Sequence, residues 1–239
     1  MELPYSVEVY AELMAAYNEG WLPATSLAPV LSLLVLALAL WPPPGHEAAA
    51  ARLIGALLAA AWLWVGWAHQ LGMMAGLNFL ATLYGAAWLA QGALLALTCA
   101  ASDRTRFRLG ADLRGRTGLA LALFGLAGYP ALALLLGLDW PAVPLAGTAP
   151  EPTAIFTSGL LLGLRARPRL HLLLIPLGWA GVSTLSAYLL AYPLDFTVAA
   201  AVLAALALGV RERAEAAARF AAARGLRQTS HECAGRSGC

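Results

Sequence analysis

Two ionisable side chains stand within strongly hydrophobic parts of the sequence, where such groups are rare. His69 lies near the end of the tryptophan-rich stretch 62–70, and Glu151 lies between Pro150 and Pro152. An ionisable group inside a membrane usually pairs with a partner and marks an ion, proton or ligand pathway. His69 and a carboxylate could therefore bind a cation, transfer a proton, or act as a general acid and base. A hydrogen-bonded histidine in an interfacial aromatic belt is the alternative interpretation of His69.

Further polar residues interrupt the hydrophobic stretches or lie at their ends, and they are candidates for binding a ligand or handling protons. They are Asn18, Glu19, Asn78, Gln91, Tyr129, Asp139, Tyr192 and Asp195. Boundary acids are usually just solvated, and the small, mildly polar stripe that includes Asn78 suits helix packing. Gln91 is less easily explained, because it falls near the middle of its stretch. The boundary acids are expected at the same face as His69, which favours a shared site there.

The residue inventory excludes several kinds of chemistry. Lysine is absent and all 15 basic residues are arginine, which excludes a retinal or pyridoxal Schiff base and a phosphate-loop NTPase. His69 is expected on the opposite side of the membrane from the other histidines, so a bis-histidine haem is not expected and no cofactor is predicted. A metal held by His69 with carboxylates stays open, although no ligand spacing supports it. His231, Cys233 and Cys239 make a weak metal pattern, and a bare tail is the favoured interpretation.

The elements that must position these residues are membrane spans. Of the 239 residues, 61% are hydrophobic and 12% charged, against about 45–50% and 25% in soluble domains. This composition excludes a soluble globular domain, and it equally excludes a disordered chain. Seven apolar stretches, one of them short, run over residues 22–41, 53–74, 77–101, 117–138, 153–164, 170–190 and 194–210.

The arginines orient these stretches, because positive residues collect in short cytoplasmic loops. If the N-terminus is outside, alternation of seven spans places all 15 arginines on the cytoplasmic side. The outer segments then hold acidic residues and no arginine: Glu2, Glu8, Glu12, Glu19, Asp139, Glu151 and Asp195. The sequence therefore predicts an all-α bundle of seven transmembrane helices in the cytoplasmic (inner) membrane, with the N-terminus outside and the C-terminus cytoplasmic.

The fifth stretch, residues 153–164, is too short to cross a bilayer alone. At 1.5 Å per residue it covers about 18 Å of a hydrocarbon core that is about 30 Å thick. The proline-rich, re-entrant segment 140–153 before it is expected to dip into the outer half of the bundle, enclosed by protein. Pro150-Glu151-Pro152 is expected not to form regular helix. Glu151 then needs a partner, and we expect His69 to line the same cavity within about 10 Å.

The chain divides into three regions. Residues 1–21 are predicted to be an external acidic segment, and residues 22–210 to be the seven-helix domain. Residues 211–239 are predicted to be cytoplasmic and to begin as a basic helix, because this part is rich in alanine and arginine. After Gly225 the chain is polar and short of helix formers, so a mobile tail is expected.

Several short motifs are spread over most of residues 5–206. They are Tyr17-Asn18-Glu19 with Trp21 and Pro23, the tryptophan-rich stretch before His69, Asn78, Tyr84-Gly85, Gln91-Gly92, Tyr129-Pro130, the run 147–153, Phe156-Thr157 and Gly159-Leu160-Leu161. In these motifs the chain resembles a family of bacterial multi-pass membrane proteins of unknown function, domain of unknown function six-zero-six-four. The family often has cysteine where this chain has Glu151 and proline where it has Phe79. A carboxylate does not replace a soft-metal ligand like for like, which weakens the case for a metal. The resemblance implies the fold and brings no assigned activity.

Acids without bases around an outer cleft attract cations and repel anions. The sequence therefore predicts transport or sensing of a small cation, proton or polar solute through an outward-facing acidic vestibule. Two alternatives stay open, namely an accessory or structural subunit of a membrane complex and a membrane-embedded enzyme that uses His69 and Glu151. A non-enzymatic role is favoured, because catalytic signature motifs are absent. The expected partners are the lipid bilayer and either another membrane protein or a second copy of the chain; nucleic acid is not expected.

Overall fold

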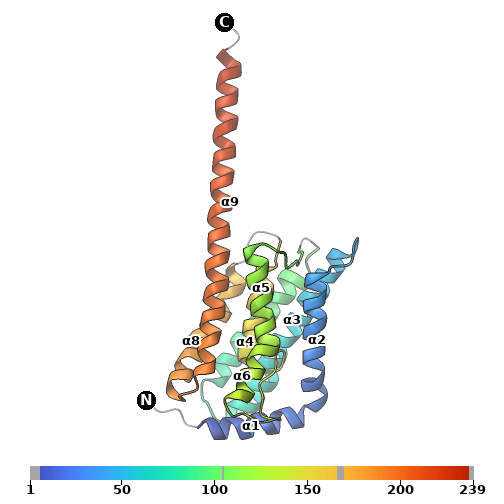
Figure 1. Cartoon of the computed structure of the whole chain (residues 1–239), viewed down its shortest axis with the longest axis vertical. Coiled ribbons are helices and arrows are strands. Elements are labelled where there is room, and N and C mark those ends of the chain that lie inside the picture. Colours follow the sequence, from blue (N-terminus) through green and yellow to red (C-terminus); the bar gives the residue numbers. More distant parts are fainter. Residues whose placement is uncertain (1–5, 104, 166–169, 237–239) are drawn as a thin grey trace.

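The chain folds into a bundle of long helices that run side by side, and the last helix extends far beyond one end (Figure 1). This computed structural model describes residues 6–103, 105–165 and 170–236, with side chains up to Arg219. Within these ranges the regular structure is helical, apart from one isolated bridge between Phe107 and Leu164. The predicted all-α class is confirmed.

Several of the helices change their hydrogen-bonding pattern along their length. The elements are α1 (Val7–Gly20), α2 (Leu22–Leu40), α3 (Glu47–Trp64), η1 (Val65–Met73), η2 (Met74–Gly76), α4 (Ala81–Leu95), η3 (Ala96–Ala100), α5 (Leu113–Leu123), η4 (Phe124–Gly128), α6 (Tyr129–Leu135), α7 (Pro150–Leu162), η5 (Leu170–Leu173), α8 (Leu174–Leu189), η6 (Pro193–Asp195) and α9 (Phe196–Arg236). The segments η1, η3 and η4 are π-helical, and η2, η5 and η6 are short 3-10 helices.

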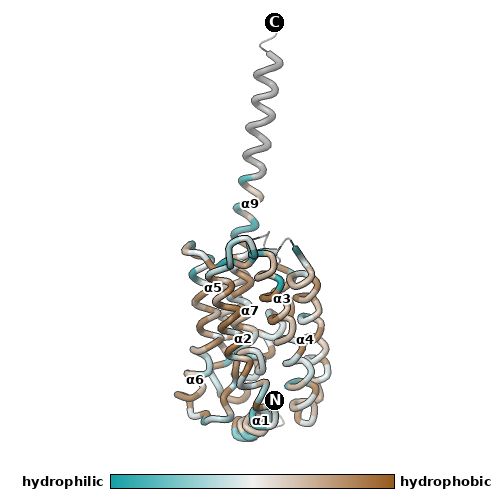
Figure 2. Tube along the Cα trace, turned by 90° about the vertical axis from the view of Figure 1, so that its right-hand side faces the viewer, coloured by the Kyte–Doolittle hydropathy of each residue, from teal (hydrophilic) through white to brown (hydrophobic). Residues whose placement is uncertain are grey.

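Six helical stretches of the described chain are long and apolar enough to cross a membrane. They are Leu22–Leu40, Glu47–Gly76, Ala81–Ala100, Leu113–Leu135, Leu170–Leu189 and Pro193–Arg219. Each overlaps one of the stretches that the sequence predicts. Figure 2 shows hydrophobic residues along the bundle and a change to hydrophilic residues where α9 leaves it.

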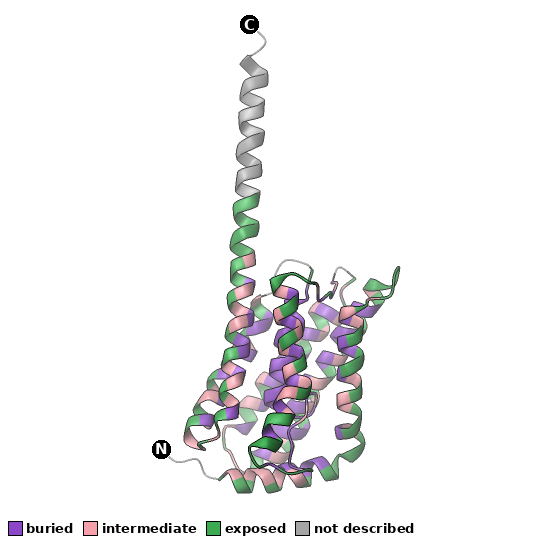
Figure 3. Ribbon diagram, viewed as in Figure 1, coloured by how far each residue is buried: buried purple, intermediate pink, exposed green. Residues whose placement is uncertain are grey.

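The remaining predicted stretch forms α7, which differs from the others because protein encloses it. All 13 residues of Pro150–Leu162 are buried, and the interior of the bundle is correspondingly marked as buried in Figure 3. The helix packs against α5, η4 and α9. Its 13 residues rise only about 20 Å, so α7 is shorter than the long helical stretches that pack around it.

The prediction that Pro150-Glu151-Pro152 stays outside regular helix is wrong. The structure places these three residues in the first turn of α7, with Ala149 as the N-cap. The first N–H groups of a helix have no acceptor within the helix, so prolines at these positions lose no hydrogen bond. Glu151 is therefore held by a helix and not by a loop.

Glycines allow α7 to touch α5 directly. A Cβ atom added at Gly159 would lie 2.5 Å from the carbonyl oxygen of Gly118, and one added at Gly118 would lie 2.6 Å from the carbonyl oxygen of Gly159. These are contacts between backbones, which cannot yield unless the helices separate. Gly125 of η4 approaches the backbone of Phe156 in the same way. Small residues thus fix the position of α7 and of Glu151 at its start.

The proline-rich segment between α6 and α7 is also enclosed by protein. Ala142, Val143 and Ala146 are buried, so neighbouring elements cover this irregular backbone. Side chains of α1 satisfy its carbonyl groups. The amide nitrogen of Asn18 donates to the carbonyl oxygens of Pro141 and Val143, at 2.5 and 3.0 Å.

Helix α1 lies across the end of the bundle opposite the α9 extension (Figure 1). The sequence predicts only an acidic external segment at residues 1–21, and the structure gives this segment a helix with two faces. Met14, Tyr17 and Asn18 are buried against the bundle, whereas the three glutamates of α1 are exposed. A helix of this kind is suited to lie along a membrane surface.

Helix α9 continues through Arg236, beyond Gly225 where the sequence predicts the helix to end. Alanine and arginine are strong helix formers, and a single glycine in a helix costs only about 1 kcal/mol. Within the bundle α9 buries Val198, Val202 and Ala205. Its described residues from Arg211 to Arg219 are mostly exposed, so this part has left the bundle.

Candidate functional site

A small cavity, lined in part by two carboxyl groups, lies at the α1 end of the bundle, and we name it the acidic cavity. Its volume is about 60 Å³, which holds roughly four to six water-sized groups. Its lining comes from nearly every element at this end, namely Val7, Tyr10, His69, Gln70, Met74, Asn78, Tyr84, Tyr129, Leu138, Pro144, Pro150, Glu151, Trp179, Val182, Ser186, Leu190, Tyr192 and Asp195.

Two carboxylates give the cavity its charge. Glu151 in the first turn of α7 and Asp195 at the end of η6 are close enough for their charges to interact. The hydroxyl of Tyr129 donates a hydrogen bond to Asp195 Oδ1. Among the lining residues there is no arginine, and His69 is the only base. Two ionised carboxylates repel each other in a buried site, so this arrangement favours a bound cation or a proton.

His69 is the buried base of the acidic cavity. Its exposed fraction is 2%, and neither ring nitrogen makes a hydrogen bond in the described part of the chain. The ring meets Tyr17 edge to face, with ring centroids 5.6 Å apart. His69 lies in the π-helical η1, and such segments are frequent at functional sites. An unpaired buried donor or acceptor lowers the free energy of unfolding by about 1–3 kcal/mol, so this ring destabilises the folded protein.

Two more polar groups of the wall are unpaired, the hydroxyl of Tyr192 and the indole N–H of Trp179. Burial raises the pKa of Tyr192 well above its ordinary value, and the nearby charges of Asp195 and Glu151 raise it further. The phenol therefore stays neutral and can donate or accept a hydrogen bond. The Trp179 indole lies beside the Glu151 carboxyl group, and its N–H has no hydrogen-bond partner among the described residues.

The structure brings six of the ten predicted site residues to the acidic cavity: His69, Asn78, Tyr129, Glu151, Tyr192 and Asp195. His69 and Glu151 thus line one cavity, as the sequence predicts. Asn78 also has a local structural role, because its Oδ1 accepts a hydrogen bond from the backbone N–H of Leu80 at 2.9 Å.

The other four predicted residues, Asn18, Glu19, Gln91 and Asp139, are not among the cavity lining. Asn18 is buried and bound to the backbone of the proline-rich segment. Gln91 is buried in the bundle, where its Nε2 donates to the carbonyl oxygen of Leu172 at 2.8 Å. Glu19 and Asp139 are exposed.

Three tryptophans form an aromatic cluster at the same end of the bundle. The rings of Trp21, Trp64 and Trp67 meet edge to face, with centroids 5.1–5.8 Å apart. Such clusters suit a membrane interface. Trp64 Nε1 donates to the hydroxyl of Tyr17 at 2.8 Å, and Tyr17 in turn contacts His69. Burial raises the pKa of Tyr17 well above its ordinary value, although the bond from Trp64 opposes this.

Metal ligation has little support in the described residues. They contain no group of three or more histidine, cysteine, aspartate or glutamate side chains placed to hold a metal ion. The tail residues His231, Cys233 and Cys239 lie outside the part whose side chains are described.

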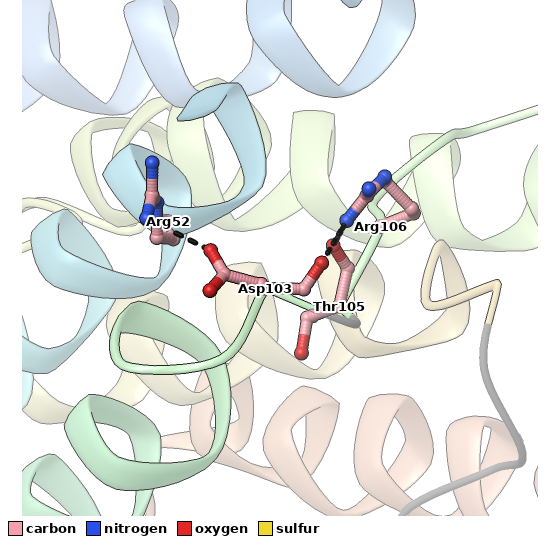
Figure 4. Close-up of polar contacts among 4 residues, drawn as sticks. All are labelled: Arg52, Asp103, Thr105 and Arg106. Atoms are coloured by element: carbon pink, nitrogen blue, oxygen red, sulfur yellow. Dashed lines mark hydrogen bonds and ion pairs between the residues drawn. The ribbon is translucent and has the colours of Figure 1, made fainter. Parts of the chain in front are cut away.

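The opposite end of the bundle carries the described arginines. Nη1 of Arg52 lies 2.8 Å from Oδ1 of Asp103, and both side chains are largely exposed. Nη1 of Arg106 donates to the carbonyl oxygens of Asp103 and Thr105, at 2.5 and 2.8 Å (Figure 4). These polar groups are thus paired with one another at the surface.

The fold and the acidic cavity both lie in a part of the chain that a known family shares. The family model described as "Family of unknown function (DUF6064)" matches residues 7–219. The chain belongs to DUF6064. The range of the DUF6064 match runs from the start of α1 to the exposed part of α9. No curated protein and no solved structure matches this DUF6064 chain.

The DUF6064 cavity also contains side chains that the sequence did not single out as site residues: Tyr10, Gln70, Tyr84, Trp179 and Ser186. Tyr10 recurs with Met14 and Tyr17 at helical spacing, a signal that could have identified the buried face of α1. Trp179 and Ser186 are two helical turns apart and share one face of α8. Gln70 carries no such periodic signal, because it lies in the π-helical η1.

Proposed function

We propose that this DUF6064 protein binds a small cation or a proton in the acidic cavity, and transports or senses it at the bacterial inner membrane. In this proposal the six long helical stretches and the enclosed α7 form seven membrane segments. The N-terminus with α1 lies outside, and residues 211–239 lie in the cytoplasm. The acidic cavity then belongs to the outer half of the protein.

Two features support this placement in a membrane. Large apolar side chains on the bundle are exposed, among them Phe79 (87%), Leu97 (71%) and Leu83 (64%), which suits contact with lipid. The arginines of the described chain belong to the end from which α9 extends, and the acidic face of α1 lies at the other end. Positive residues collect on the cytoplasmic side of membrane proteins.

One observation carries the proposed cation or proton binding. Glu151 and Asp195 share a cavity with the unpaired ring of His69, and the lining contains no arginine. A site of this composition has a negative potential, which attracts cations and repels anions. Intramembrane acids without a basic partner are typical of ion and proton pathways.

The test compares wild-type protein with Glu151→Gln and Asp195→Asn in detergent. Calorimetry with Na⁺, K⁺ and ammonium salts measures cation binding, and potentiometric titration measures proton uptake. We expect one of these two signals, and we expect each substitution to weaken it at least tenfold. Glu19→Gln and Asp139→Asn are the controls, because they remove exposed acids outside the cavity. Wild-type signals that persist in the Glu151→Gln/Asp195→Asn double variant would contradict the proposal.

The proposed orientation of the protein in the membrane has a separate test. A reporter fused after Cys239 should read cytoplasmic, and one fused before Met1 should read external. A cytoplasmic N-terminus would overturn the seven-segment arrangement without affecting cation binding by purified protein.

A second candidate function, that of an accessory subunit of a membrane complex, is favoured by a different surface. An apolar groove of about 180 Å³ lies between α2, α3 and the start of α7, and a partner helix could pack there. Cross-linking from Leu27 or Leu57 in the groove, followed by identification of the captured protein, tests this role. The enzyme alternative requires His69 to act together with a carboxylate, and neither nitrogen of His69 forms a hydrogen bond to one among the described residues.

A further inference from the structure

We propose that the cation of the acidic cavity is a small protonated amine, a primary or secondary alkylammonium ion. This inference rests on the proposed function, because it names the chemical class of the cation. Three properties of the cavity lead to it: its unpaired hydrogen-bond acceptors, its apolar and aromatic walls, and its small volume.

The acceptors come from different elements and meet in one cavity. Glu151 and Asp195 supply carboxyl oxygens, and a bound cation favours their ionised form. The neutral ring of His69 has one acceptor nitrogen and one N–H, and neither is used within the described chain. The unpaired hydroxyl of Tyr192 is a further acceptor. An ammonium group with two or three N–H donors can use a carboxylate and His69 at the same time.

The buried, unpaired ring of His69 distinguishes this site from a cluster of acidic residues alone. Its ring is almost completely buried, lines the cavity and lacks a hydrogen-bond partner. Tyr17 holds the ring by an edge contact only, so packing and not hydrogen bonding sets its orientation. A donor on the ligand would satisfy a ring nitrogen that the protein itself leaves unsatisfied.

The remaining walls suit alkyl groups better than a hydrated ion. Apolar side chains form much of the lining, namely Val7, Met74, Leu138, Pro144, Pro150, Val182 and Leu190. Aromatic rings of Tyr10, Tyr84 and Trp179 complete it, and such rings attract organic cations. Hard inorganic cations such as Ca²⁺ instead take about six to eight oxygen ligands, and the described residues contain no group of three or more histidine, cysteine, aspartate or glutamate side chains placed to hold a metal ion.

The charge and the volume of the cavity exclude further kinds of amine. An amino acid would bring its own carboxylate close to Glu151 and Asp195, with no arginine in the lining to bind it. A quaternary ammonium ion has no N–H group for His69. The volume of about 60 Å³ holds roughly four to six water-sized groups, so the ligand has only a few carbon atoms.

Calorimetry on the purified full-length protein tests the class directly. The probes are methylammonium, ethylammonium and dimethylammonium, compared with tetramethylammonium, Na⁺ and K⁺ as chloride salts at equal ionic strength. We expect the three N–H-bearing ions to bind at least tenfold more tightly than the other three. Because Trp179 is part of the wall, its fluorescence should also change on binding, and Trp179→Phe should remove that change.

Variants test the part played by His69. His69→Phe keeps an aromatic edge beside Tyr17 but removes both nitrogens, and it should weaken methylammonium binding roughly tenfold, the equivalent of one lost hydrogen bond. Tyr192→Phe removes only a hydroxyl and should cause a smaller loss. Asp139→Asn, an exposed acid outside the lining, should leave binding unchanged. A melting curve of each variant confirms that it is folded.

The possible results separate this inference from the proposed function. Binding of Na⁺, K⁺ or protons without preference for alkylammonium ions would overturn the inference and leave the proposed function standing. Equal affinities for methylammonium and tetramethylammonium, unchanged in His69→Phe, would also overturn it. If no cation binds and no proton is taken up in the cavity, both the inference and the proposed function are wrong.

Discussion

An exposed ion pair at the arginine end of the bundle and two buried side chains of the acidic cavity at the α1 end differ in burial and in pairing. At the arginine end, Arg52 and Asp103 form an ion pair in exposed positions, and Arg106 donates to two backbone carbonyl groups. At the α1 end, the ring of His69 and the hydroxyl of Tyr192 have no hydrogen-bond partner within the described chain. Both of these lie in the acidic cavity.

The difference predicts opposite effects of substitution at the two places. Exposed ion pairs contribute about 0–1 kcal/mol, so removing one should change stability little. Unpaired buried groups lower stability by about 1–3 kcal/mol each, so replacing one by an apolar group should raise stability. In the proposed function, a bound ligand supplies the missing hydrogen-bond partners. The predictions below test this contrast, from the largest expected effect to the smallest.

The largest effect is expected at the backbone contact that positions α7. Gly159→Val adds a side chain where even a Cβ atom would lie 2.5 Å from the carbonyl oxygen of Gly118 and 2.6 Å from the backbone nitrogen of Ala122. The helices must separate, so we expect a loss of more than about 4 kcal/mol, seen as failure to yield folded protein by size-exclusion chromatography.

The matched control is Gly181→Val in α8, where nothing lies within 4 Å of an added Cβ atom. This variant should purify like the wild type. Normal folding of Gly159→Val would mean that α7 is not held against α5, and the rigid placement of Glu151 would then be wrong.

The second prediction concerns the residue that joins α1 to the proline-rich segment. Asn18→Leu removes both hydrogen bonds to the carbonyl oxygens of Pro141 and Val143, leaving these groups unpaired. We expect the free energy of unfolding to fall by about 2–4 kcal/mol, measured by reversible denaturation in detergent. Glu19→Gln, the exposed neighbour, should change it by less than about 0.5 kcal/mol. Equal effects of the two substitutions would contradict a structural role for Asn18.

The third prediction has the opposite sign. His69→Phe replaces a buried, unpaired ring by an apolar ring of similar shape, so the protein without ligand should become more stable by about 1–2 kcal/mol. Denaturation in the absence of amines measures this gain. A matched loss of cation binding in the same variant would show that the α1 end gives up stability for function. A marked destabilisation would instead mean that His69 serves the fold.

The sequence predicts best what depends on average composition. Hydropathy identifies the long spans because each must present about 20 apolar residues to lipid, and the stretches 22–41 and 170–190 agree closely with α2 and with η5 and α8. His69 and Glu151 both line the acidic cavity, as predicted, because ionisable groups within membrane segments turn toward one another and both residues are expected at the outer face.

The sequence predicts poorly what depends on particular neighbours. The first turn of α7 was missed because the rule that proline breaks helices does not hold where no N–H is needed. The sequence marks Asn18 as a candidate site residue, and its residue type does not show that its amide nitrogen donates to backbone carbonyls more than 120 positions away. The π-helical η1, which carries His69, was not expected either, because a local change of hydrogen bonding leaves little trace in hydropathy.

The smallest effect is expected for the exposed pair at the arginine end. Arg52→Gln removes the ion pair with Asp103, whose side chain is 77% exposed while that of Arg52 is 49% exposed. Water solvates both groups when the pair is broken, so the free energy of unfolding should fall by less than about 1 kcal/mol. A double-mutant cycle with Asp103→Asn isolates the interaction, and raising the salt concentration should reduce it further. A coupling well above 1 kcal/mol would mean that water does not solvate the Arg52–Asp103 pair as its exposure indicates, and the contrast with the acidic cavity would lose its physical basis. A small coupling, together with a stability gain in His69→Phe, would mean that polar groups of the acidic cavity lower the free energy of unfolding whereas the exposed pair hardly affects it.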